Sequence, residues 1–270
     1  LPSNDVDAVF HLASPTSVPE SIIRPIKYEN GCLDMTRLVF KWSVTNNVKY
    51  FTFSSTSAVY GESQNIPLSE ESDESPMSPY AKYKLLSEKY LNTFSENLDC
   101  QVSIMRFFNV FGPRQDIHRK SPPLINYIVR QIKNKEKLTF YSNGEQLRDY
   151  VHVDDVVSMI EACINSNKAV GQTFNLCTET LTSVKDIINY AETAFGKFEY
   201  EFVEASKYWN GYDIIFDGEK PLLDEVVVRE VNKYSLGSIN KARQYLRWLP
   251  NRNIQKLMVE TMKQNMEIIK

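Results

Sequence analysis

The chain has 270 residues, of which 42% are hydrophobic and 24% are charged, a composition typical of a globular protein with a sizeable core. Its 31 lysines and arginines against 34 acidic residues leave a formal net charge of −3, which argues against a protein that binds nucleic acid through bulk positive charge. No apolar run approaches the roughly 18–20 residues that span a bilayer, so we expect no membrane partner, and the first residues show no signal-peptide pattern.

The cysteines and histidines are scattered along the chain. The four cysteines form neither a C-x-x-C pair nor a zinc-binding spacing, and this usage favours a reducing, cytoplasmic setting. The three histidines are equally dispersed, and we expect no metal site.

The first part of the chain alternates between short apolar runs and helix-like stretches. The runs at residues 6–13, 48–54 and 101–107 have the length and composition of buried strands. Residues 30–47 and 79–94 have the apolar spacing of helices, and Pro79 stands in the first turn, where proline is tolerated. This alternation predicts βαβ units and a parallel sheet.

The pattern becomes less regular after residue 109. We expect helices over residues 124–133, 152–165, 184–195, 238–246 and 253–268, and strands over 138–141 and 173–177. The stretch from 200 to 234 is mixed, and its pattern predicts no single element.

Residues 54–61 read SSTSAVYG and stand at the carboxyl end of a predicted strand. Open α/β sheets bind their ligands at this end of the strands. A cluster of Ser and Thr after a strand is more often simple turn chemistry, so the segment gains weight only together with others.

The second segment, residues 80–84 (YAKYK), begins a predicted helix. Tyr80 and Lys84 are four residues apart and therefore share one helix face. A cation there lowers the pKa of a phenol from its usual ~10 and allows the tyrosine to move protons at a sugar hydroxyl. A chain with 15 tyrosines contains about one Tyr-x-x-x-Lys by chance, so the spacing alone is weak.

Together with residues 106–114 (RFFNVFGPR), these segments form a recognisable series. The chain resembles the NAD-dependent nucleotide-sugar epimerase/dehydratase branch of the extended short-chain dehydrogenases/reductases. The resemblance extends through residues 9–14 (VFHLAS), residues 144–156 (GEQLRDYVHVDDV) and residues 248–250 (WLP). Several separate motifs in the family's order make this a specific match over nearly the whole chain.

The resemblance implies a fold and a domain division. We expect an α/β protein with a doubly wound parallel sheet of Rossmann type, incomplete at its N-terminal part, and a smaller mixed α/β substrate domain towards the C terminus. The NAD-binding domain is expected over residues 1–109 and 150–177, and the nucleotide-sugar-binding domain over residues 110–149 and 178–270.

The resemblance also implies roles for single residues. Thr56, Tyr80 and Lys84 match the catalytic Ser/Thr, Tyr and Lys of the family. The positions that line NAD are matched by Leu12, Ala13, Ser14, Asn30, Ser54, Tyr80, Lys84 and Phe108.

Three further residues are candidates for holding the substrate beside Thr56. Asn109 and Arg148 match groups that bind the nucleotide diphosphate, a task that suits a planar and permanently charged guanidinium. Arg229 is a candidate second arginine for the diphosphate, and a solvated surface arginine is an equally good interpretation of it.

The sequence departs from the family at its beginning. Family members start with a glycine-rich strand–turn–helix for the pyrophosphate, followed by an acidic residue for the adenosine ribose. This chain begins with Leu1, has only 9 glycines, and contains no G-x-G-x-x-G. We expect a fragment of a longer protein, or a start that lies outside this chain, with weakened binding of adenosine diphosphate. A natural absence of the segment stays open, as does the choice between NAD and NADP.

A second departure distinguishes between reactions. In this segment the dehydratases of the family read S-T-D-E-V-Y-G, and the decarboxylases that make UDP-xylose read S-T-S-E-V-Y-G. Here Ser57 stands in place of the aspartate of the dehydratases, and Ala58 stands in place of the glutamate of both. Residues 11–17 (HLASPTS) nevertheless are similar to the HLASPAS of the decarboxylases. Alanine performs no acid–base chemistry, which argues against elimination of water and decarboxylation. The reaction left is oxidation at one carbon followed by its reversal, and this is 4-epimerisation.

On this interpretation Tyr80 takes the proton of the sugar 4-hydroxyl, directly or through Thr56, and NAD accepts and returns the hydride through a transient 4-keto sugar. The alternatives are a decarboxylase, a dehydratase, a 4-keto reductase, or a non-catalytic relic that binds sugar nucleotides. The sugar stays open, and the resemblance favours uracil as the base.

The helices at 30–47 and 79–94 resemble the pair that forms the dimer interface in this family. Phe40, Leu86 and Tyr90 extend beyond a minimal core stripe, so we expect a homodimer.

Overall fold

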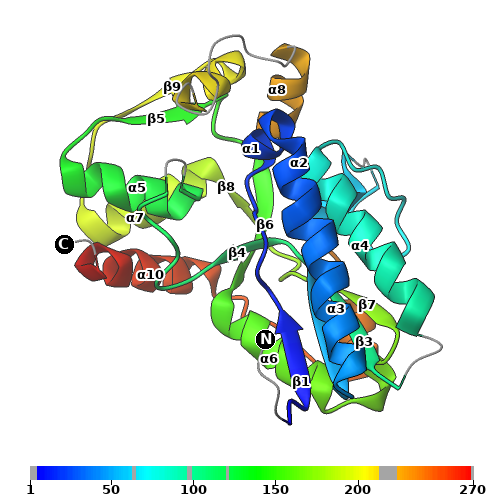
Figure 1. Ribbon diagram of the computed structural model, residues 1–270. Coiled ribbons are helices and arrows are strands. Elements are labelled where there is room, and N and C mark those ends of the chain that lie inside the picture. Colours follow the sequence, from blue (N-terminus) through cyan, green and yellow to red (C-terminus); the bar gives the residue numbers. More distant parts are fainter. Residues whose placement is uncertain (1–4, 63–64, 96–98, 120–121, 213–223, 269–270) are drawn as a thin grey trace. The chain divides into compact units, whose positions relative to one another are not determined.

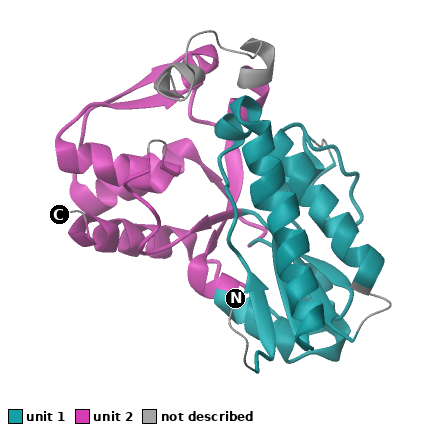
Figure 2. Cartoon of the chain, in the orientation of Figure 1, with its two compact units in different colours: residues 1–108, 157–177, 237–249 teal, residues 109–156, 178–236, 250–270 magenta. Residues whose placement is uncertain are grey.

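A computed structural model describes residues 5–62, 65–95, 99–119, 122–212 and 224–268 (Figure 1). The chain divides into two compact units, shown in different colours in Figure 2. The first unit contains residues 1–108, 157–177 and 237–249, and the second contains residues 109–156, 178–236 and 250–270.

A four-stranded parallel sheet forms the centre of the first unit. Its order is β1 (Ala8–His11), β2 (Tyr50–Thr56), β3 (Gln101–Phe107) and β7 (Gln172–Leu176). β2 is buried from Phe51 to Thr56, as expected for a parallel strand with neighbours on both sides and helices over its faces. The α/β class with a parallel sheet of Rossmann type is therefore confirmed.

The helices of the first unit include the two longest ones predicted from its sequence. They are α1 (Val18–Ile23), α2 (Pro25–Tyr28), the π-helix η1 (Glu29–Asp34), α3 (Met35–Thr45), the 3₁₀ helix η2 (Ser57–Tyr60), α4 (Pro79–Ser95), the 3₁₀ helix η3 (Asn167–Ala169) and α9 (Asn240–Leu246). The predicted helix over 30–47 is thus found as η1 followed directly by α3. α6 (Val153–Ile164) crosses from the second unit into the first.

One face of this sheet is covered by α3 and α4. Phe40 of α3 and Leu91 of α4 pack against Phe51, Phe53 and Ile104 of the central strands. Phe40 is only 2% exposed. Its expected place on an outer dimer face is therefore wrong, because the ring fills the space between the helix and the sheet.

The proline-containing stretch after β1 forms two short helices that the sequence pattern does not predict. Ser17 is the N-cap of α1, where its hydroxyl accepts the backbone N–H of Glu20, and Pro19 stands within the first two positions. Pro25 begins α2 in the same way. Proline at the first turn lacks only an N–H that would have no helical partner, so these residues initiate helices and do not break them.

The second unit combines small sheets with helices. Its elements are β4 (Asn109–Phe111), α5 (Leu124–Asn134), β5 (Leu138–Tyr141), β6 (Leu147–His152), β8 (Leu181–Ser183), α7 (Val184–Phe195), β9 (Tyr200–Val203), the 3₁₀ helix η4 (Ala205–Tyr212), α8 (Asp224–Asn232) and α10 (Ile254–Ile268). β6 pairs parallel with β4 and antiparallel with β8, and β5 pairs parallel with β9. Of the mixed stretch 200–234, residues 213–223 lie outside the described residues.

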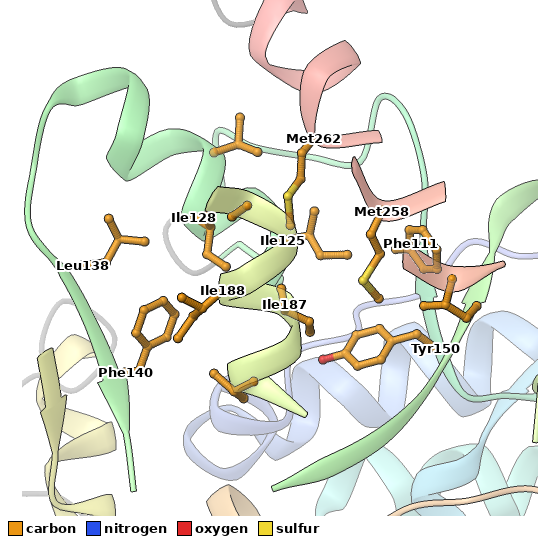
Figure 3. Close-up of a cluster of buried hydrophobic side chains, with 14 of the residues drawn as sticks. Phe111, Ile125, Ile128, Leu138, Phe140, Tyr150, Ile187, Ile188, Met258 and Met262 are labelled. Carbon is orange, nitrogen blue, oxygen red and sulfur yellow. The ribbon is translucent and has the colours of Figure 1, made fainter. Parts of the chain in front are cut away.

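The core of the second unit lies between α5, α7 and α10 (Figure 3). Ile128, Ile187 and Met262, one from each helix, are fully buried there, and Phe111 and Tyr150 border the cluster from β4 and β6. This unit therefore has an apolar core of its own.

The unit boundaries differ from the expected domain boundaries at residue 109, at residues 150–156 and at residues 237–249. α9 packs on β7, and the indole N–H of Trp248 donates to the hydroxyl of Ser158 at 2.9 Å. These contacts group residues 237–249 with the parallel sheet, although they follow the second unit's residues in the chain. A division by sequence position misses that residues 237–249 return to the first unit, because long-range packing and not chain order decides where they lie.

Candidate active site

The carboxyl end of β2 and the beginning of α4 bring together the first candidate pair. Thr56 ends β2, and its side-chain oxygen accepts the backbone N–H of Ala58 at 3.2 Å as the cap of η2. The same hydroxyl stands beside the phenol of Tyr80, where it favours the ionised phenol and so acts to lower its pKa.

The position of Tyr80 follows from how α4 begins. Pro79 is the first residue of α4, and the Ser78 hydroxyl accepts the backbone N–H of Ala81 at 3.2 Å. Side-chain capping of this kind fixes where a helix starts. The phenol of Tyr80 is 8% exposed and packs with Tyr28 and Cys32 in a small cluster.

Lys84 lies on the same face of α4 as Tyr80, as its spacing predicts. Its amine donates to the backbone carbonyl oxygen of Ser54 at 2.6 Å and lies 4.7 Å from the centre of the Phe53 ring. Burial lowers the pKa of Lys84 from 10.5 to about 8, because the charged amine loses its hydration. With this pKa, the amine of Lys84 changes between its charged and neutral forms slightly above neutral pH.

The pKa of Tyr80 is raised to about 12 in this structure. Burial is the main cause of the raised pKa, and the Thr56 hydroxyl, which favours the ionised phenol, opposes it. This direction is opposite to the one that the Tyr-x-x-x-Lys spacing predicts. The spacing correctly places both side chains on one face, but the Lys84 amine is bound by a strand carbonyl, and the phenol is desolvated.

The remaining candidate cofactor residues lie at the ends of β1 and β2 and on nearby elements. Leu12 and Ala13 are exposed directly after β1, and Asn30 is exposed on η1. Ser54 is buried, and its hydroxyl donates to the carbonyl oxygen of His11 at 3.1 Å, which joins β2 to β1. Ser14 is half-buried next to Leu12 and Ala13. These residues gather at one end of the parallel sheet.

Phe108, the last candidate for the cofactor, is 6% exposed. Phe108 follows directly after β3, and its backbone N–H donates to the carbonyl oxygen of Leu176, the last residue of β7, at 3.1 Å. A Cβ added to Gly237 would lie 2.6 Å from the Phe108 ring, so the ring is packed against backbone of the first unit. Phe108 thus also lies at the carboxyl end of the sheet.

The candidate substrate residues belong to the second unit, apart from Thr56. The Asn109 side-chain amide donates to the carbonyl oxygen of Asp149 at 2.9 Å. Arg148 donates to the backbone carbonyl oxygens of Glu230 and Val231, both at 3.2 Å, and burial lowers its pKa. Arg229 is exposed on α8.

Two further residues lie near the Tyr80–Lys84 pair: Tyr28, which has no signal in the sequence, and His11, which stands in the VFHLAS motif. The rings of Tyr28 and Tyr80 pack edge to face with their centres 6.2 Å apart. The Tyr28 hydroxyl accepts the backbone N–H of Ser17 at 2.9 Å and donates to the carboxylate of Glu20 at 3.0 Å. His11 is buried at the end of β1, where burial and then the charge of Lys84 lower its pKa to about 4. His11 is therefore neutral near pH 7.

The residues present suit one half of a dinucleotide better than the other. Exposed apolar Leu12 and Ala13 stand at the same end of the sheet as the polar Tyr80 and Lys84. This combination fits a flat heterocyclic amide such as nicotinamide, which needs an apolar surface and few polar partners. The sequence holds no glycine-rich turn for a pyrophosphate.

The part of the chain that the structure describes contains neither a metal-binding cluster nor a membrane-spanning helix. No group of three or more His, Cys, Asp or Glu residues there is arranged to hold a metal ion. No helix among the described residues is both long enough and apolar enough to cross a membrane.

A parallel sheet of Rossmann type with a threonine at a strand end and a Tyr-x-x-x-Lys pair at the following helix defines an extended short-chain dehydrogenase/reductase. The sequence pattern of the NAD dependent epimerase/dehydratase family matches residues 1–177, and the chain belongs to this family.

Individual relatives agree with this assignment. The chain is 31% identical over 227 residues to the UDP-glucose 4-epimerase of Lactobacillus helveticus, a match that covers 79% of this chain and 64% of that protein. The UDP-N-acetylglucosamine 4-epimerase from Methanobrevibacter ruminantium M1, solved with UDP-N-acetylmuramic acid, has a TM-score of 0.83 and 28% identity over 97% of this chain and 77% of its own. The UDP-glucose 4-epimerase from Thermotoga maritima, solved with UDP-glucose, has a TM-score of 0.82 and 26% identity over 98% and 78%. The chain spans 48 to 64% of the length of four curated relatives that it matches.

Proposed function

We propose that the protein interconverts the C4 epimers of a UDP-sugar in an NAD-dependent reaction that passes through a transient 4-keto sugar. The observation that carries the proposal is the meeting of α4 with the carboxyl end of β2, where Tyr80 and Lys84 share one helix face, the Lys84 amine donates to Ser54, and the Thr56 hydroxyl stands beside the Tyr80 phenol. Family membership and the similarity to two solved 4-epimerases support the reaction class.

In the proposed reaction Tyr80 is the acid–base group. As tyrosinate it takes the proton of the sugar 4-hydroxyl, directly or through the Thr56 hydroxyl, and it returns the proton after the keto sugar has turned. The Ala58 N–H holds the oxygen of Thr56 in place during both transfers. Protonated Lys84, one helical turn away, stabilises the tyrosinate when its amine is charged.

The cofactor is proposed to bind at the same end of the sheet. When bound, NAD supplies a hydride acceptor and a positively charged nicotinamide ring. Tyr80, Lys84 and the residues already described there are proposed to line it: Leu12, Ala13, Ser14, Asn30, Ser54 and Phe108. A positive charge beside Tyr80 offsets the burial that raises its pKa, so we infer that the phenol becomes a competent base only in the loaded protein.

The second unit is proposed to hold the nucleotide. Arg148 is half-buried and donates to backbone carbonyl oxygens, so its guanidinium is not neutralised by a carboxylate at those contacts. A diphosphate is a stronger acceptor for arginine than a neutral carbonyl. Asn109 and Arg229 are proposed to assist, and the two units correspond to cofactor-binding and sugar-nucleotide-binding domains.

Ala58 argues for epimerisation over the related reactions. Elimination of water needs a base for the C5 proton and an acid for the leaving hydroxyl, and Ser57 and Ala58 supply neither carboxylate. Epimerisation needs only the tyrosine, the neighbouring hydroxyl and room for the sugar to turn.

We further propose a cytoplasmic homodimer. All four cysteines are buried and none of them forms a disulfide, as suits a reducing compartment. Leu38 of α3 and Leu86 of α4 are 61% and 48% exposed, and large apolar side chains exposed on neighbouring helices favour a protein partner.

The test of the function uses the complete gene product and NAD. UDP-glucose, UDP-N-acetylglucosamine, UDP-glucuronic acid and UDP-arabinose are each incubated with the protein, and the products are identified by NMR. The expected result is a C4 epimer from at least one of them. A protein that binds UDP-sugars without converting any would support the non-catalytic alternative.

A further inference from the structure

Three side chains on one face of α4 contact the last three residues of β2. Tyr80, Lys84 and Glu88 are four residues apart, which aligns them along the helix. The Tyr80 phenol stands beside the Thr56 hydroxyl, the Lys84 amine donates to the Ser54 carbonyl oxygen, and the Ser55 hydroxyl donates to the Glu88 carboxylate. We call this row of three contacts the α4–β2 seam.

The third contact of the seam is held by a buried ion pair. Glu88 and Arg106 are 2% and 3% exposed. The Arg106 Nε donates to both carboxylate oxygens of Glu88 at 3.1 and 3.2 Å, and its Nη2 donates to one of them at 2.7 Å. Arg106 stands opposite Ser55 in the pairing of β3 with β2. Glu88 therefore ties α4 to two neighbouring strands at one level of the sheet.

Arg106 also holds the loop that leads into α4. Its Nη2 donates to the carboxylate of Glu74, and its Nη1 donates to the backbone carbonyl oxygen of Glu70 at 3.4 Å. Its guanidinium lies 4.8 Å from the centre of the Tyr60 ring, which follows the SSTSAV segment. The chain before Tyr80 and the helix after it are thus fastened to a single side chain.

We propose that Glu88 and Arg106 are positioning residues, which set the distance between the Tyr80 phenol and the Thr56 hydroxyl by fixing α4 against β2. This proposal rests on the proposed function and deepens it. Arginine and carboxylate meet in a planar, directional geometry, so the pair defines both how far and at what angle the helix lies from the strands. Apolar packing alone allows a helix to slide.

A purely structural role makes a different prediction. A buried ion pair often contributes little net stability compared with apolar residues of similar size, while the loss of one partner destabilises the fold. In that case the folded fraction of a variant decreases, but each folded molecule keeps its turnover. Reacting groups displaced by about 1 Å lose up to 10²-fold in rate, so a positioning role lowers turnover in folded protein.

The experiment compares Glu88→Gln with Ser87→Ala in the complete gene product loaded with NAD. Ser87 is the neighbouring residue on α4 and is also buried, but its hydroxyl bonds the backbone carbonyl oxygens of Tyr83 and Cys32 and not β2. With the UDP-sugar that the panel identifies, Glu88→Gln is expected to lower kcat about tenfold per folded molecule while KM changes less than twofold. Ser87→Ala is expected to keep kcat within twofold.

Hydrogen exchange gives a readout that needs no turnover and so separates this proposal from the proposed function. Glu88→Gln is expected to speed exchange of the backbone amides of residues 79–86 while residues 101–105 of β3 stay protected. Unchanged kcat with unchanged exchange at 79–86, or equal effects of both variants, would overturn the proposal. If Glu88→Gln does not fold, Glu88→Asp keeps the charge with a shorter reach, and the same outcomes apply to it.

Discussion

The amine of Lys84 donates a 2.6 Å hydrogen bond to the backbone carbonyl oxygen of Ser54, the residue after Phe53 in β2. The lysine is therefore fastened to the strand that ends in Thr56, while the phenol of Tyr80, one helical turn before it, stands beside the Thr56 hydroxyl. The helix face and the strand end form one polar contact region, and the predictions below follow from its geometry and burial.

The first prediction concerns Tyr80. Tyr80→Phe removes the hydroxyl that stands beside Thr56 and keeps the ring that packs edge to face with Tyr28. Turnover of the loaded, complete protein is expected to decrease by a factor of ~10² or more, the usual scale for loss of an acid–base group. Circular dichroism should report an unchanged fold. Turnover close to that of the wild type would exclude Tyr80 as the acid–base group.

The second prediction follows from the pKa of Lys84, about 8 in the folded protein against 10.5 ordinarily. Between these values the unfolded chain binds more protons than the folded one, so Lys84 makes stability increase as the pH rises through this range. The free energy of unfolding of wild type minus that of Lys84→Met is expected to rise by roughly 2–3 kcal/mol from pH 7.5 to 10.

Denaturant titrations at several pH values measure this difference. Groups that titrate in both proteins cancel in the subtraction, including Tyr80, whose raised pKa acts in the opposite direction above pH 10. A difference that stays flat with pH would mean that the folded protein does not lower the pKa of Lys84.

The third prediction concerns the cofactor and the chain of residues 1–270 alone. Its residues at the carboxyl end of β1 and β2 suit a nicotinamide, and its sequence has no glycine-rich turn for a pyrophosphate. NAD and nicotinamide mononucleotide are therefore expected to bind to this chain with similar, weak affinity in calorimetry. Binding of NAD ten or more times tighter than the mononucleotide would reveal a pyrophosphate site elsewhere in the chain.

The fourth prediction separates the reactions open to the family. With Ala58 at the position of the glutamate, product and substrate are expected to have equal mass, and no net NADH is released. A deuterium at C4 of the sugar is expected to stay at C4, because the hydrogen leaves and returns within one bound complex. Mass spectrometry and NMR read both outcomes. Loss of water or of carbon dioxide would overturn the assignment as an epimerase.

The fifth prediction concerns assembly. Leu38→Glu and Leu86→Glu place charges on the exposed faces of α3 and α4 and are expected to convert a dimer into monomers, as measured by light scattering at micromolar concentration. Leu249→Glu is the matched control, because Leu249 is 63% exposed but lies outside both helices. A monomeric mass for the wild type would reject the proposed dimer.

Local patterns predicted elements of both units. The strands at 101–107 and 138–141 and the helix at 184–195 have the predicted bounds. Side-chain spacing and the capping residues determine such elements within a few residues of chain. The short strands β4 and β6 were not predicted, because three to six residues that pair with distant partners carry little periodicity of their own.

The candidate site also has some features that the sequence shows and others that only the folded structure decides. The spacing of Tyr80 and Lys84 follows from helix geometry and is visible in the sequence, as are the Ser and Thr residues at the end of a strand. The packing of the folded chain decided that Lys84 bonds a carbonyl of β2, that burial raises the pKa of Tyr80, and that Arg106 reaches Glu88. These contacts join residues far apart in the chain, and the energy of a charge or a phenol depends on whether such neighbours exclude water.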